Sequence, residues 1–176
     1  MTKSFIVDPK TGKLLTAQEW KETAGENVAS AKIVAIVPDD GSPAFAFPVE
    51  TFGDHPWPEA MDIADKYQAP HAIAGANGSF TLPTRKQAID IRAAREAGLE
   101  QLLEMIGAQD LLDELRHRWG WTCEKYIPGG TSEDRWSCVR ASSGHAWSYD
   151  NAGMSAYRGF TYGLTVRPVT LLNLNS

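Results

Sequence analysis

The spacing of apolar residues along this chain changes near Gly120. Upstream, residues 57–69 and 84–107 carry apolar side chains at helical intervals of three and four. Downstream, apolar and polar residues alternate in short stretches separated by Gly, Ser, Asp and Asn, as in half-buried strands. These stretches are residues 121–126, 135–140 and 145–150. Strands, then helices, then aromatic strands predict an α+β protein.

The first 30 residues have the pattern of a hairpin followed by a short helix. Residues 5–7 and 14–15 are apolar and flank a turn. Thr16 and Glu19 have the spacing of a capping box, which predicts a helix immediately after them. We therefore predict an N-terminal appendage at residues 1–30 and a main domain at residues 31–176.

The main domain opens with apolar strands and continues with helices. Strands are predicted at 31–37 and 44–49, and a closing strand at 162–169. Thr84 and Gln87 form a second capping box at the start of the longer helical pattern. Gly98 interrupts that pattern, so two helices or one broken helix are expected, followed by a short helix at 110–118.

The composition limits the classes of partner. The chain has 176 residues, 43% of them apolar, and a net charge of −5. An acidic protein with no basic patch is not expected to bind nucleic acid, because that binding needs a basic face. No apolar segment has the length of a signal peptide or a membrane span, so no membrane association is expected. The expected location is the cytoplasm at synthesis, or a phage virion, whose proteins have the same kind of N-terminus.

Four segments carry a resemblance to a known family. They are TLPTRKQAIDI at 81–91, WGWTCEKY at 119–126, VRPV at 166–169 and the helical pattern at 60–67. In this order they resemble the LPT-plus-helix signature, an aromatic strand, the closing strand and the first helix of the Lcl C-terminal-domain-like family of C-type-lectin-like modules from bacteria and phages. The resemblance covers residues 31–172, although Cys123 stands where the family usually has Ser.

The resemblance implies a C-type-lectin-like fold. In that fold the first and last strands pair, two helices flank a mixed, mostly antiparallel sheet, and a loop-rich C-terminal half presents a variable surface. Members are associated with adhesion, the bacterial surface or phages. This chain lacks the Glu-Pro-Asn, Gln-Pro-Asp and Trp-Asn-Asp triplets with which true lectins hold calcium and sugar.

Cys123 and Cys138 lie in similar contexts on two predicted strands. If those strands pair, the thiols could form a redox or copper pair, because the formylglycine-generating enzymes have a related fold and use two cysteines. We favour the alternative that both are small buried hydrophobic residues, since the Cys-x-x-Cys spacing is missing.

The remaining polar residues do not indicate a metal site. The histidines are far apart and have no zinc-binding spacing, and no acidic loop has the pattern of a calcium site. No metal, cofactor or enzymatic activity is therefore expected.

The aromatic residues of the last third divide into two groups. Trp119, Trp121 and Trp136 lie in alternating strand patterns and are expected in the core. The second group lies among Gly, Ser and Asn, a composition typical of binding surfaces. Its members, the predicted ligand-binding residues, are Trp147, Tyr149, Asp150, Asn151, Tyr157, Arg158 and Tyr162.

The sequence thus predicts a non-catalytic recognition module that binds a protein or glycan through the surface near residues 145–162. One alternative is a structural or assembly component, such as a phage tail or accessory protein. A second alternative is a thiol- or copper-dependent enzyme on a related fold.

Overall fold

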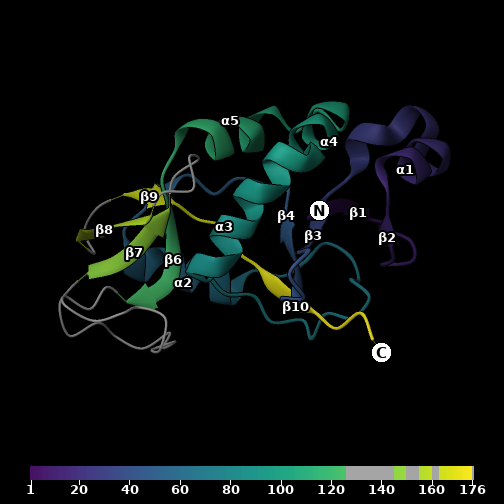
Figure 1. The fold of residues 1–176 in the computed structure, drawn as a ribbon. Coiled ribbons are helices and arrows are strands. Elements are labelled where there is room, and N and C mark those ends of the chain that lie inside the picture. The colour runs from purple at the N-terminus through teal and green to yellow at the C-terminus, as the bar shows by residue number, and fades with distance from the viewer. Residues whose placement is uncertain (126–144, 150–154, 160–162, 176) are drawn as a thin grey trace.

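The computed structural model describes residues 1–125, 145–149, 155–159 and 163–175. Their strands form two five-stranded sheets, where the sequence had predicted one mixed sheet. The long helix α3 runs between the two sheets and contacts strands of both (Figure 1). The architecture is α+β.

The first sheet is antiparallel throughout and has the strand order β10-β4-β3-β1-β2. Its strands are β1 (Lys3–Val7), β2 (Leu14–Leu15), β3 (Ile33–Val37), β4 (Ala44–Pro48) and β10 (Thr170–Leu172). The strands predicted at 31–37 and 44–49 are confirmed as β3 and β4. Both lie inside the sheet and are almost entirely buried, as expected for continuous apolar runs.

The second sheet has the strand order β5-β9-β6-β7-β8. Its strands are β5 (Asp54–His55), β6 (Gly120–Lys125), β7 (His145–Tyr149), β8 (Ser155–Gly159) and β9 (Leu164–Thr165). The pairing of β6 with β9 is parallel, and the other pairings are antiparallel. The predicted change from helices to strands near Gly120 is therefore confirmed.

The helices begin where the sequence predicts. They are α1 (Ala17–Ala24), a 3₁₀ segment (Gly25–Ser30), α2 (Trp57–Lys66), α3 (Arg85–Ala94), α4 (Glu100–Met105) and α5 (Gln109–His117). Both capping boxes are confirmed. The hydroxyl of Thr16 accepts from Glu19 N at 3.2 Å, and that of Thr84 accepts from Gln87 N at 3.1 Å. In each box the side chain at the third position accepts from the cap residue's N–H in return.

The predicted interruption at Gly98 is a π-helical segment, Arg95–Leu99, which joins α3 to α4. Gly98 has φ +125, a conformation that residues with a Cβ rarely adopt. Glu100, the first residue of α4, accepts hydrogen bonds from Arg95 and from Arg116 of α5, so one carboxylate connects the segment to α5. The pattern therefore forms two helices, α3 and α4, joined across a kink, which is one of the two predicted alternatives.

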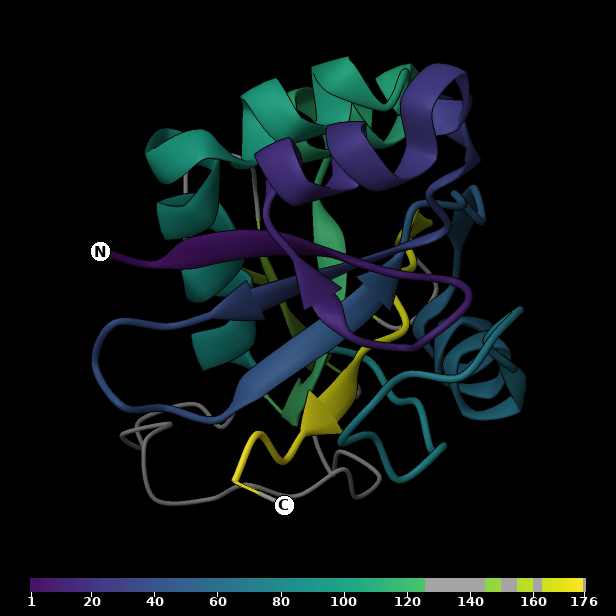
Figure 2. The same cartoon turned by 90° about the vertical axis from the view of Figure 1, so that its right-hand side faces the viewer.

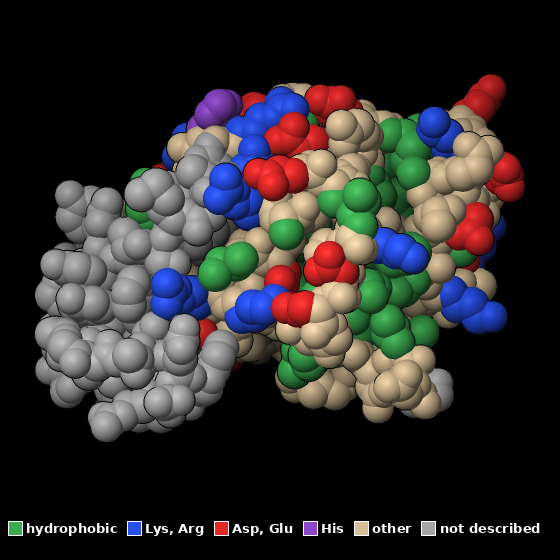
Figure 3. All heavy atoms as spheres, in the orientation of Figure 1, with side chains coloured by type: hydrophobic (Ala, Val, Ile, Leu, Met, Phe, Trp, Pro, Cys, Tyr) green, Lys and Arg blue, Asp and Glu red, His purple; other side chains and the backbone are tan. Residues whose placement is uncertain are grey.

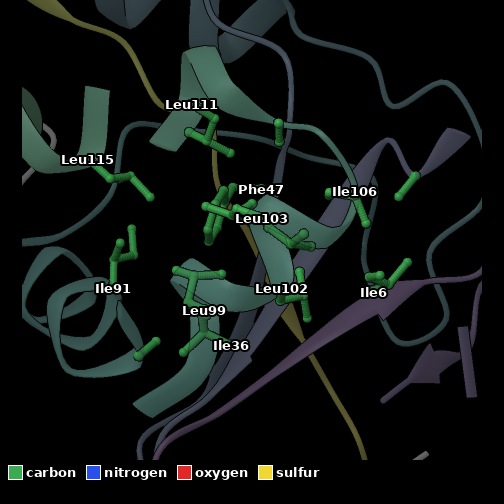
Figure 4. Packing of buried hydrophobic residues seen from close by; sticks show 14 of the residues in the cluster. Ile6, Ile36, Phe47, Ile91, Leu99, Leu102, Leu103, Ile106, Leu111 and Leu115 are labelled. Atoms are coloured by element: carbon green, nitrogen blue, oxygen red, sulfur yellow. The ribbon is translucent and has the colours of Figure 1, made fainter. Parts of the chain in front are cut away.

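The described residues form three hydrophobic clusters in the core. The largest lies between the first sheet and the helices, with Phe47 and Leu103 among its central residues (Figure 4). The second joins α2 to the second sheet through Trp57 and Trp121. The third covers the opposite face of the first sheet, where small residues such as Ala35 allow close packing of the segment around residues 69–76.

The first 30 residues share this core. β1 pairs with β3 inside the first sheet, and Trp20 of α1 is buried in the largest cluster. Figure 2 shows α1 beside the other helices along one side of that sheet. The boundary at residue 30 stays a prediction about domains, but residues on both sides of it pack into one hydrophobic cluster.

The prediction of one closing strand at 162–169 is wrong. β9 ends at Thr165 in the second sheet, and β10 begins at Thr170 in the first sheet, pairing with β4. Between the two strands, Pro168 has no N–H to donate to a ladder, and Arg167 turns toward Glu114 of α5. The end of the chain therefore connects the two sheets, and the alternation of apolar and polar residues did not indicate this crossing.

Candidate functional site

The predicted recognition surface falls on the β7–β8 hairpin. The register places Trp147 opposite Tyr157, Tyr149 opposite Ser155 and Ala146 opposite Arg158. Directly opposed residues share one face of an antiparallel pair, as do residues two apart on a strand. Positions 147, 149 and 157 therefore share one face of the hairpin, and position 158 lies on the other.

The structure brings together only part of the predicted set. Trp147, Tyr149 and Tyr157 meet at neighbouring positions, with Arg158 on the same strand as Tyr157. Asp150, Asn151 and Tyr162 lie outside the described residues. So do Trp136 and Cys138.

The hairpin is attached to the rest of the molecule through β6 and α3. β7 pairs with β6, and α3 lies against both strands. Trp121 of β6 is fully buried, which confirms its assignment to the core. Trp119 is only partly buried and packs against the same cluster from its edge. Cys123 is also buried, and its backbone N–H donates to Pro83 O at 2.9 Å.

Glu124 of β6 is a buried carboxylate that the sequence analysis did not single out. Its Oε1 accepts from the backbone N–H of Arg85 at 2.9 Å, at the N-terminus of α3, where a negative charge is favourable. Only 4% of Glu124 is exposed, and this burial raises the pKa of its carboxyl group against the effect of the hydrogen bond. No local spacing could have revealed the contact, because the partners are 39 residues apart.

Lys86, one residue further along α3, links the helix to the first sheet. Its ammonium group lies 2.9 Å from Asp40 in the β3–β4 turn and also contacts Asp90 on the next turn of α3. Asp90 is buried, and burial raises the pKa of its carboxyl group although Lys86 opposes that effect. The four-residue spacing of Lys86 and Asp90 could have predicted this helical pair. The first turn of α3 is therefore attached to β6 by Arg85 and to the β3–β4 turn by Lys86.

Arg167 and Glu114 form a second unpredicted contact, between the β9–β10 connection and α5. Arg167 Nη2 donates to Glu114 Oε2 at 2.5 Å. The side chains are 1% and 10% exposed, respectively. Burial raises the pKa of Glu114, while the guanidinium group of Arg167 acts in the opposite direction.

The hollows on the described surface include a groove beside β10 and a smaller hollow along α5. The groove, of about 610 Å³, is lined by apolar residues, including Leu171 and Leu174, and by uncharged polar residues such as Asn173. Figure 3 shows hydrophobic side chains gathered near the C-terminal end of the chain. The smaller hollow, of about 330 Å³, runs along α5 and is lined by four carboxylates and by Arg118, which pairs with Asp54 at 3.0 Å. Nothing in the structure identifies an occupant for either hollow.

Comparison of the sequence with protein-family models and with curated proteins gave no match. Within the described ranges, no three His, Cys, Asp or Glu side chains are grouped so that they could hold a metal ion. Among the described helices, none has both the length and the apolar character needed to cross a membrane.

Proposed function

We propose that this chain is a non-catalytic recognition module of the C-type-lectin-like kind, which binds a protein or glycan through the surface formed by β7 and β8. The observation that carries the proposal is the register of the hairpin, which sets Trp147 opposite Tyr157 with Tyr149 two positions along. Tyrosine and tryptophan supply large, rigid contact area at low entropic cost, and they are enriched in binding surfaces.

The order of strands and helices along the chain supports the proposed fold. The last strand, β10, pairs antiparallel with β4, an early strand of the predicted main domain. The helices α2 and α3 follow β4, and the aromatic strands of the second sheet come after them. One difference from the expected fold is that β10 pairs with the second strand of that domain and not with its first.

The test is the double variant Trp147→Ala/Tyr149→Ala, probed on a glycan array and on an array of bacterial surface proteins. We expect the wild type to be captured by one class of spot, and the double variant to lose that capture while its melting temperature is unchanged. Leu171→Ala is the matched control, because Leu171 is an exposed apolar residue of the other sheet. Capture that survives in the double variant would refute the proposal.

Two other outcomes would favour the alternatives. No capture on either array, together with a defined oligomer by light scattering, would indicate an assembly component. Copper bound to the purified protein, and lost in Cys123→Ala/Cys138→Ala, would indicate a metal-dependent enzyme. Each result differs from the one expected for a recognition module.

A further inference from the structure

The connection between β9 and β10 carries a charged residue through the interior. Arg167 is 1% exposed, and its single ion-pair partner among the described residues is Glu114 of α5. The Cζ atom of Arg167 lies 5.7 Å from the centre of the Phe47 ring, in the largest hydrophobic cluster. A guanidinium group in such surroundings loses its hydration free energy, and only its contacts within the protein can compensate for that loss.

The contacts of Arg167 are incomplete. Its Nε and Nη1 atoms are buried and have no hydrogen-bond partner among the described residues. Burial also raises the pKa of Glu114 in spite of the adjacent positive charge. Buried pairs with unsatisfied atoms are frequently no more stabilising than apolar residues of similar volume. Net stability is therefore a poor explanation for this pair.

The apolar residues around Arg167 specify the register of this segment only weakly, and a buried charge can specify it. Residues 164–170 are all buried, so no polar face marks the orientation of this segment. Leu171 and Leu172 are adjacent and chemically identical, yet Leu171 is 52% exposed and Leu172 only 5%. A shift of one residue against β4 that moves Leu171 into the place of Leu172 would still leave a leucine in the core. The hydroxyl of Thr170 is buried and has no hydrogen-bond partner in the described part of the chain, so it does not favour the observed register either.

We infer that the Glu114–Arg167 ion pair determines the register of the β9–β10 connection, that is, the residue at which the chain crosses from the second sheet to the first. The pair does not increase the net free energy of unfolding. A shift by one residue would move Arg167 away from Glu114 and leave both charges buried and unpaired. Burial of apolar side chains distinguishes such registers less well, because the hydrophobic effect depends on the area buried and not on contact with one particular partner. The pair therefore excludes alternative registers that hydrophobic burial alone would allow.

The test compares single and double replacements. Glu114→Met and Arg167→Met each leave one buried charge unpaired, so each should lower the urea midpoint of unfolding. The double variant Glu114→Met/Arg167→Met should regain the wild-type midpoint or exceed it. In that variant the backbone amides of residues 169–172 should give two sets of NMR signals and exchange about tenfold faster than in the wild type, whereas the amides of β3 keep their exchange rates.

An exposed pair provides the control. Lys66 and Asp62 form an ion pair on the surface of α2, and Lys66→Met/Asp62→Met should change neither the midpoint nor the amide signals. The inference would be overturned if the Glu114/Arg167 double variant were as unstable as the single variants or failed to fold, since the pair would then supply stability. A single set of amide signals with wild-type shifts and exchange rates would equally overturn it, since the register would then be fixed without the pair.

Discussion

The indole rings of Trp57 and Trp121 donate hydrogen bonds in opposite directions across the contact between α2 and β6. Trp57 Nε1 donates to Thr122 O at 3.0 Å, and Trp121 Nε1 donates to His55 O at 2.7 Å. Each segment thus provides one donor and one acceptor, and both indoles belong to the second hydrophobic cluster. The segment that carries β5 and α2 is therefore held against the second sheet by two directional hydrogen bonds as well as by hydrophobic burial.

Replacing Trp57 with Phe should lower the free energy of unfolding by about 1–3 kcal/mol, because the buried carbonyl of Thr122 loses its donor. Urea denaturation measures this difference. Tyr67→Phe is a suitable control, since Tyr67 packs edge-on against Phe52 and Phe80 and its hydroxyl makes no hydrogen bond within the described part of the chain. Equal stability of both variants would show that the indole N–H is not required at this contact.

Two glycines with the same backbone conformation should respond differently to replacement by alanine. Gly75 has φ +83 and Gly78 has φ +85. A Cβ at position 75 would lie 2.5 Å from Asn173 O, whereas at position 78 no described atom lies within 4 Å. We expect Gly78→Ala to cost about 1–2 kcal/mol from backbone strain alone. Gly75→Ala should cost clearly more, because the backbone after β10 has to move as well.

Thermal unfolding of the two glycine variants side by side separates strain from the clash. Faster amide exchange at Asn173 in Gly75→Ala, but not in Gly78→Ala, would locate the added cost in the hydrogen bond from Asn173 N to Gly75 O. The same loss of stability in both variants would contradict the clash.

The pH dependence of stability should change in Glu124→Gln. Burial raises the pKa of Glu124 in the folded protein above its usual value near 4.5. The folded state therefore binds the proton more tightly, and the stability associated with this group is present below pH 4.5 and is lost as the pH rises through the folded-state pKa. Glutamine keeps an acceptor for Arg85 N and removes the titration, so the variant should lose this decline just above pH 4.5.

Asp40→Asn should have the opposite effect. The hydrogen bonds from Lys86 and Ser42 lower the pKa of Asp40 below its usual value of 3.8. Its contribution to stability is therefore present above pH 3.8 and is lost as the pH falls. Urea midpoints measured from pH 3 to pH 7 report both effects, and parallel profiles for wild type and variants would refute the assignment.

Features encoded within a few residues could be predicted from the sequence. The capping boxes at Thr16 and Thr84 need only a hydroxyl and a partner three residues later. The interruption at Gly98 and the strand at Ile33–Val37 likewise follow from local composition. Local features of this kind do not depend on tertiary contacts, so they can be predicted without knowing which distant residues meet.

Features that depend on distant partners could not be predicted in this way. Glu124 and Arg167 occur in sequence contexts that fit exposed strand positions, and their burial depends on contacts 39 and 53 residues away. The division of the last strand between two sheets likewise depends on the position of β4. In the candidate site, aromatic composition indicated the hairpin, but the opposition of Trp147 and Tyr157 depends on a register that composition does not encode.

The segment from β9 to β10 has a consequence for synthesis of the protein. Val166 completes the second hydrophobic cluster, Val169 the first and Leu172 the third. While these nine residues are still inside the ribosome, the emerged chain has three clusters that each lack a member, with apolar surface exposed. All three clusters can therefore be complete only after Leu172 leaves the exit tunnel, and until then the incomplete clusters leave apolar surface at which aggregation can start.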